Sequence, residues 1–349
     1  MRESWKQALL ENLRQRGIVD EAAAAAVMQQ SPAPWFVHLF AGLAAWLAAL
    51  MLILSSALAL AHDSLFGAIL IGAMLLGLAV WLLRQPGIFL AQMGLALSLA
   101  GQGMLVYAVG ELSGFDELRS CALSGALVAL GMLWVPAPAL HRVLCALGVF
   151  AGVAVLIGFN GWLSLYGLLL AGLALLLWLR RGAWAGAPQA LVWRAVAAAA
   201  TLAAMALPLI ARRDWTLPLG RLADEAAWVL WLYPLGAATL LLGVALWLVR
   251  GQSLARVASV GIACLVVGAL GWAAPGLLVT GALWLALFRA CERLWCALVG
   301  LVVTLYLGDL YYSLHLSLLH KSMVLMLSGV VLLLLRWLVL RFWEAGNES

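Results

Sequence analysis

Hydrophobic positions along the chain form a series of long apolar segments, separated by short breaks that contain Arg, Gly or Pro. A helix needs about 20 predominantly apolar residues to cross a bilayer, and from Trp35 onward twelve segments are candidates. The expected spans are 36–60, 65–83, 88–110, 120–136, 143–159, 162–179, 195–211, 227–249, 257–273, 276–289, 294–308 and 321–341. Because several are short, ten to twelve crossings are expected. The pattern predicts an all-α, polytopic transmembrane helical bundle.

The residues before the first span form the one sizeable polar segment at the N-terminus. Apolar residues at four-residue spacing predict a short amphipathic helix that ends at Gly17, and Asp20 is a suitable N-cap for a second, Ala-rich helix. We therefore expect a cytoplasmic helical hairpin that lies on the membrane surface or caps the bundle as a docking element, with a binding role as the alternative. The expected organisation is 1–34 for this hairpin, 35–343 for the membrane domain and 344–349 for a tail.

Composition supports lipid as the solvent of this chain. Hydrophobic residues make up 66% and charged residues 10% of the 349 positions, whereas soluble domains carry roughly 25% charged residues. The net charge of +5 follows from Arg-containing loops that face anionic lipid, so membrane lipids are the expected partners and nucleic acid is not.

The distribution of basic residues predicts the orientation. With twelve crossings and a cytoplasmic N-terminus, 15 of the 20 Lys and Arg residues fall on the inner side, as the positive-inside rule requires. Both termini are then cytoplasmic. Arg212 and Arg213 are the weak point of this assignment, because they fall on the outer side.

No pattern of catalytic or metal-binding residues stands out. The five cysteines are scattered and lack CxxC spacing, which favours small packing residues over a zinc site or a disulfide framework. The motifs HExxH, GxSxG, GxxxxGK[ST] and GxGxxG are absent from the sequence. We therefore expect a protein that is not an enzyme, with no catalytic residue, metal or cofactor.

Polar residues gather most densely before the last apolar segment. The candidate polar site there consists of Asp309, Tyr311, Tyr312, His315, His320 and Lys321. A single helix over 294–341 would be about 70 Å long, so we expect a break at Gly308, followed by an outer-face segment that turns into the last span. This segment is either an interfacial anchor or an outward-facing site for a proton, an ion or a polar substrate.

The third span adds two amides to the candidate polar site, Gln92 and Gln102. Ser98 and Gln102 are one helical turn apart in a run that is otherwise apolar, which is typical of hydrogen bonds between membrane helices. A polar path lined by these groups is the alternative. Small residues at four-residue spacing predict close packing of helices at Gly94–Ser98, Gly148–Gly152 and Gly167–Ala171.

Two stretches resemble known families. The run Asp309-Leu310-Tyr311-Tyr312, followed by residues 318–322 and Gly329, resembles the C-terminal part of bacterial membrane proteins grouped as domain of unknown function 4401. The segment 17–20 with the Ala-rich helix after it is similar to the start of the related 2157 family. The resemblance implies a multi-pass protein of the bacterial cytoplasmic (inner) membrane, and it carries no catalytic residues with it.

Three functions remain open on the sequence alone. The favoured one is a non-enzymatic membrane component or assembly partner, whose helices bind lipid or another membrane protein. The first alternative is a transporter or channel-like protein for an ion or small molecule, which uses the polar site near the outer face. The second alternative is a membrane enzyme that acts on lipid-linked substrates.

Overall fold

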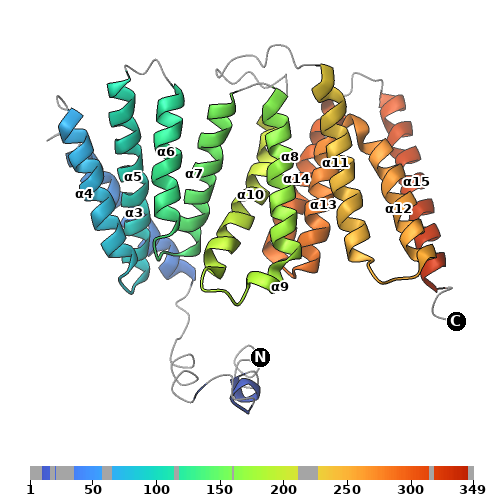
Figure 1. Cartoon of the computed structure of the whole chain (residues 1–349), viewed down its shortest axis with the longest axis horizontal. Helices are drawn as coiled ribbons and strands as arrows, with labels where there is room; N and C mark the ends of the chain where they lie inside the picture. The colour runs from blue at the N-terminus through green and yellow to red at the C-terminus, as the bar shows by residue number, and fades with distance from the viewer. Residues whose placement is uncertain are drawn as a thin grey trace.

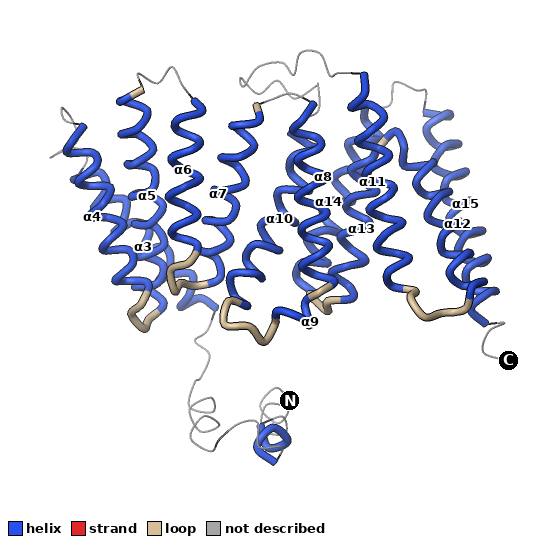
Figure 2. The backbone as a smooth tube through the Cα atoms, viewed as in Figure 1, coloured by secondary structure: helices blue, strands red, loops and turns tan. Residues whose placement is uncertain are grey.

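The helices stand side by side with roughly parallel axes. Together they form a row along the longest dimension of the molecule (Figure 1). This computed structural model describes residues 10–15, 20, 35–56, 65–113, 118–158, 161–210, 227–313 and 318–344. These residues contain no strand (Figure 2). Their helices of at least 15 residues are α3 (Trp35–Ser56), α4 (Leu65–Leu83), α5 (Ile88–Leu112), α6 (Leu118–Leu133), α7 (Ala139–Ile157), α8 (Gly161–Leu179), α10 (Ala190–Ile210), α11 (Ala227–Leu248), α12 (Leu254–Leu270), α13 (Pro275–Arg289), α14 (Arg293–Ser313) and α15 (Leu318–Glu344).

These helices correspond one to one with the expected spans, and their ends differ by a few residues. Counted over the described residues, seven helices are long and apolar enough to cross a membrane, and four shorter apolar helices accompany them. The all-α, multi-pass architecture that the sequence predicts is confirmed. Of the predicted N-terminal hairpin, residues 10–15 are helical and Asp20 is exposed, whereas the rest of 1–34 lies outside the described residues, as do Arg212 and Arg213.

The helices alternate in direction, so the described turns fall on two sides of the row. The turns 84–87, 134–138, 180–189, 249–253 and 290–292 lie on the side where α15 ends (Figure 1). We call this side the turn face and the opposite side the far face. A short helix, α9 (Arg181–Trp184), lies between α8 and α10, and a 3-10 helix, η2 (Gly271–Ala273), follows α12 on the far face.

One predicted break is wrong. The sequence places an interruption at Gly308, but α14 continues through this residue to Ser313. A Gly costs a helix only about 1 kcal/mol, and the continuation gives α14 its 21 residues, enough to cross a bilayer. Helix α14 ends at Ser313 and α15 begins at Leu318, and residues 314–317 lie outside the described residues.

The main core lies where α8, α10, α11, α13 and α14 meet. Its members are chiefly Ala and Leu, and the buried Trp178 fills its turn-face end. The indole Nε1–H of Trp178 donates to Thr201 Oγ1 at 3.0 Å, which gives the buried indole nitrogen its partner. Two smaller clusters lie toward the N-terminal end, one of α3, α4 and α5 and one built mainly of α6, α7 and α10.

Small residues allow the closest helix contacts, as predicted. A Cβ atom added at Gly152 would lie 2.7 Å from the Ala122 carbonyl oxygen, and one added at Gly94 would lie 3.0 Å from Leu83 Cγ. A Cβ atom added at Gly148 would lie 3.2 Å from a neighbouring alanine Cβ, whereas the nearest such contact of Gly167 is an ordinary 3.6 Å. Close packing is therefore confirmed at Gly94, Gly148 and Gly152.

Candidate functional site

The C-terminal members of the predicted polar site lie at the far-face ends of α14 and α15. Tyr311 and Tyr312 are in the last turn of α14, where their rings meet edge to face with centroids 5.5 Å apart. Tyr312 is exposed, and so is His320 in the first turn of α15. Exposed aromatic rings at helix ends are typical of the level of the lipid headgroups.

The other C-terminal members of the predicted polar site are described only in part. Asp309 belongs to α14 and Lys321 to α15, but their side chains lie outside the description, as does the whole of His315. Gln92 and Gln102 are on α5, near the opposite end of the long dimension from α15 (Figure 1). The structure does not bring these two amides together with the C-terminal residues.

Gln102 belongs instead to a buried polar network between α5 and α7. Ser98 Oγ lies 2.9 Å from His141 Nε2, and the amide of Gln102 donates to Ser98 Oγ at 3.1 Å. Both Ser98 and His141 have 0% of their surface exposed. Cys145 Sγ, one turn after His141, lies 3.9 Å from the Gln102 amide nitrogen. The network thus joins two i, i+4 pairs on different helices.

The geometry of Cys145 shows that it packs on the imidazole of His141. Its sulfur lies 3.8 Å from Nδ1 and 3.7 Å from Nε2. The two ring nitrogens direct their hydrogen bonds in the ring plane and away from each other, so a sulfur equidistant from both is aligned with neither. The pair is therefore arranged neither as an acid and a base nor as two ligands of one metal ion.

The Ser98–His141 contact has the distance of a nucleophile–base pair, but the pair is enclosed. Covalent catalysis requires that a substrate atom reach the hydroxyl, and neither side chain has exposed surface. The contact instead connects α5 to α7, two helices that both pack on α6. Sequence reasoning missed His141, although its i, i+4 spacing from Cys145 mirrors the spacing of Ser98 and Gln102.

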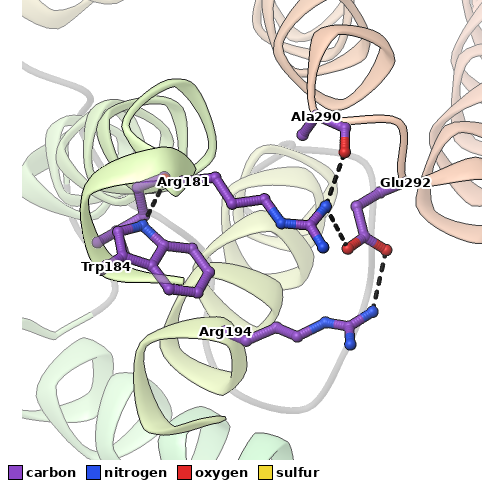
Figure 3. Close-up of polar contacts among 6 residues, drawn as sticks. Arg181, Trp184, Arg194, Ala290 and Glu292 are labelled. Atoms are coloured by element: carbon purple, nitrogen blue, oxygen red, sulfur yellow. Dashed lines mark hydrogen bonds and ion pairs between the residues drawn. The ribbon is translucent and has the colours of Figure 1, made fainter. Parts of the chain in front are cut away.

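A second polar cluster lies on the turn face and joins turns that are distant in sequence. Glu292 Oε2 accepts a hydrogen bond from Arg194 Nη2 at 3.1 Å, and Glu292 Oε1 forms an ion pair with Arg181 Nη1 at 2.9 Å. Arg181 Nη1 also donates to the Ala290 carbonyl oxygen at 2.7 Å. Figure 3 shows both arginines converging on the carboxylate. The Arg181–Glu292 contact lacks the alignment of a hydrogen bond, so it is mainly electrostatic.

The local backbone presents Glu292 to these arginines. Helix α13 ends in a Schellman turn, in which Glu292 N–H donates to the Leu287 carbonyl and Cys291 N–H donates to that of Phe288. Cys291 occupies the left-handed position, with φ of 57°, where Gly is usual. The turn holds Glu292 in a buried position, while Cys291 is exposed. Sequence reasoning also missed Glu292, a lone acid among inner-side arginines.

Neither cluster has the donor set of a metal centre. Within the described part of the chain, no group of three or more His, Cys, Asp or Glu residues is arranged to hold a metal ion. The two clusters are links between helices, one inside the bundle and one at its turn face. The exposed surface carries many Leu, Phe and Trp side chains, as expected of helices that face lipid.

Comparison with known proteins agrees with the architecture. No curated protein and no solved structure matches the chain. A family model does match, over residues 34–342 of the 349-residue chain. The chain belongs to the family described as "Domain of unknown function (DUF4401)".

Proposed function

We propose that this protein is a non-enzymatic component of the bacterial cytoplasmic membrane that binds another integral membrane protein through α15. The observation that supports this function is the isolation of α15 within the bundle. None of its described side chains is buried, and its main neighbour is α12. Each of the other helices of at least 15 residues has two or more buried residues among those described.

An isolated helix in lipid gains much from a packing partner. Lipid tails are as apolar as Leu, so the hydrophobic effect does not favour contact between α15 and the bundle. Helices in lipid associate instead through close packing of their side chains. A Cβ atom added at Gly329 would have no neighbour within 4 Å, so another helix has room to approach there. This open helix favours a membrane-embedded partner over a soluble one.

The charges of the described residues support the proposed orientation. Only two basic residues of the described helices, Arg119 and Lys321, lie near the start of a helix on the far face. The turns and helix ends of the turn face carry Arg84, Arg142, Arg180, Arg181, Arg194, Arg250, Arg256, Arg289, Arg293 and Arg341. By the positive-inside rule, the turn face is the cytoplasmic one in this proposal.

Site-specific photocrosslinking in living cells tests the partner. A photoreactive residue at Leu333 on α15 is compared with one at Leu127 on α6, because the two side chains expose similar fractions of their surface, 65% and 60%. We expect one discrete crosslinked membrane protein from position 333 and none from position 127. The partner should also copurify in a mild detergent at a fixed ratio to the tagged protein.

A matched pair of variants tests whether the contact is specific. Gly329→Leu fills the open surface of α15, whereas Gly77→Leu fills a similarly open position on α4. Copurification should fall several-fold with Gly329→Leu and remain with Gly77→Leu. If the protein purifies alone and monodisperse, or if position 333 crosslinks only to a second copy of this chain, the proposed function is wrong.

A further inference from the structure

Arg142 is a buried cation with no counter-ion among the described residues. It is the fourth residue of α7, at the turn face, and only 9% of its surface is exposed. Its Nε is buried and has no hydrogen-bond partner, and no carboxylate of the described residues forms an ion pair with it. An unpaired charge is costly to bury, so buried arginines normally have an anionic partner. The described part of the chain therefore provides no anion for Arg142, although its buried position calls for one.

The start of α7 makes this position more unfavourable still. Arg142 lies near the N-terminus of a 19-residue helix, where the aligned peptide dipoles place a partial positive charge. The first turn of α7 contains no acidic residue, and its N-cap, Pro138, makes no side-chain hydrogen bond. A cation at this end of a helix repels the dipole instead of complementing it. An anion near this turn would compensate both the side chain and the helix.

The backbone of this turn offers hydrogen-bond donors to such an anion. Arg142 N–H donates to the Pro138 carbonyl oxygen. The N–H groups of Ala139, Leu140 and His141, which precede it, make no hydrogen bond within the described part of the chain. Arg142 directly follows these open donors in the first turns of α7, and helix side chains tend to lean toward the N-terminus. Free N–H groups at a helix start, together with an arginine, are the usual elements of a phosphate site.

Neighbouring helices enclose the Arg142 side chain on the inner side of α7. Helix α7 packs on α6 and α10, and the side of α7 next to Arg142 contributes Cys145 and Ala146 to the buried cluster there. Leu140 in the same turn is exposed. Because α7 begins on the turn face, a ligand reaches this turn from that side.

We propose that Arg142 and the open N–H groups at the start of α7 bind a phosphate group, supplied by an anionic phospholipid of the leaflet next to the turn face. A phosphodiester has two oxygens that share its negative charge, so it can accept from the guanidinium and from the backbone donors together. A soluble phosphate ion has the same chemistry, and the experiment below distinguishes the two sources. The site is independent of α15 and of its partner.

Arg256 provides a matched control. It is the third residue of α12, and this helix also begins on the turn face without a side-chain cap. The Nε of Arg256, like that of Arg142, is buried and makes no hydrogen bond with the described residues. Arg256 is only half-buried, however, and its Nη1 donates to Gln252 Oε1 at 2.9 Å, so its guanidinium already has a polar partner. Arg142→Gln and Arg256→Gln change the net charge equally. A general attraction between lipid and the basic turn face affects both variants alike.

The test uses the purified full-length protein in dodecyl maltoside, a detergent whose headgroup contains no phosphate. Dioleoylphosphatidylglycerol is titrated, and bound lipid is counted by native mass spectrometry while the melting temperature is measured. Dioleoylglycerol, which has the same acyl chains and no phosphate, is the control lipid. Inorganic phosphate at the same concentrations tests the soluble source.

We expect saturable binding of one phosphatidylglycerol that raises the melting temperature of the wild type. Its affinity should fall about tenfold or more in Arg142→Gln, the effect of one charge-assisted hydrogen bond, and remain nearly unchanged in Arg256→Gln. Arg142→Lys keeps the charge but loses the planar fork of donors, so it should bind with intermediate affinity. Stabilisation by inorganic phosphate alone, if it is lost in Arg142→Gln, would identify a soluble phosphate as the ligand.

The melting temperature without any ligand shows whether Arg142→Gln destabilises the fold or only removes the phosphate site. Without lipid or phosphate, Arg142→Gln should melt no lower than the wild type, because the substitution removes an unpaired buried charge. A lower melting temperature under these conditions would mean that the protein itself compensates Arg142, and this would overturn the proposal. Equal weakening by Arg142→Gln and Arg256→Gln, or no effect of either phosphate source, would also overturn it.

Discussion

Glu292 and Arg194 form an ion pair of 3.1 Å, although 98 residues separate them along the chain. The pair joins the turn after α13 to the start of α10, and Arg181 brings α9 to the same carboxylate. The side chain of Glu292 is 10% exposed, while those of Arg181 and Arg194 are 37% and 50% exposed. The cluster thus fixes one end of the main core from the turn face.

Replacing the central carboxylate should loosen this end of the bundle. Glu292→Gln leaves two arginines without their counter-ion, so we expect a loss of about 1–2 kcal/mol in the free energy of unfolding. Arg194→Gln should cost less, because this side chain is half exposed. A double-mutant cycle in detergent measures the coupling, expected at about 0.5–1 kcal/mol. Glu111→Gln, at an exposed end of α5, is the control; strictly additive effects of Glu292→Gln and Arg194→Gln would contradict the pairing.

The Ser98–His141 hydrogen bond should stabilise the contact between α5 and α7. Ser98→Ala leaves His141 Nε2 without its 2.9 Å partner, at a cost of about 1 kcal/mol. Ser259→Ala is the matched control, because this buried hydroxyl donates to the Arg256 carbonyl of its own helix. Thermal unfolding in detergent should therefore show a larger loss for Ser98→Ala. Equal losses would mean that the hydrogen bond between the helices contributes nothing.

Two glycines should respond in opposite directions to the same substitution. Gly152→Ala places a methyl group 2.7 Å from the Ala122 carbonyl oxygen, so α6 and α7 must separate, at a cost of about 1–3 kcal/mol. Gly131→Ala on α6 meets no atom within 4 Å and should raise stability by up to about 1 kcal/mol, because Ala favours the helix. Melting temperatures of both variants decide the matter. A neutral Gly152→Ala would show that the helices are less closely packed.

The hydropathy pattern predicts the helices correctly, but it places some helix starts too late, where an arginine lies in the first turns of the helix. The span expected at 65–83 coincides with α4, which contains no charged residue. The spans expected from 143 and 195 begin instead at Ala139 and Ala190, because α7 includes Arg142 and α10 includes Arg194. A hydropathy pattern assigns arginines to loops, whereas their long side chains allow a helix to continue to the interface.

The candidate site was less accessible to sequence reasoning. The spacing of Ser98 and Gln102 predicted a hydrogen bond between helices, but it did not reveal His141 as the partner, 43 residues away. Glu292 likewise forms its ion pairs with Arg181 and Arg194, which are 98 or more residues away in the sequence and lie close to it only in the fold. The C-terminal polar set, which is dense in sequence, has Tyr312 and His320 exposed at helix ends.

The most direct test of this account is the side of the membrane on which the turn face lies. Cys291 is exposed in the turn 290–292, so a variant that keeps it as the single cysteine can be labelled with a membrane-impermeant maleimide. A second variant, free of the native cysteines, carries Glu111→Cys at the far face. We expect Cys291 to react only after the cells are permeabilised, and position 111 to react in intact cells. Labelling of Cys291 in intact cells, or of both positions equally, would contradict the proposed threading of the chain.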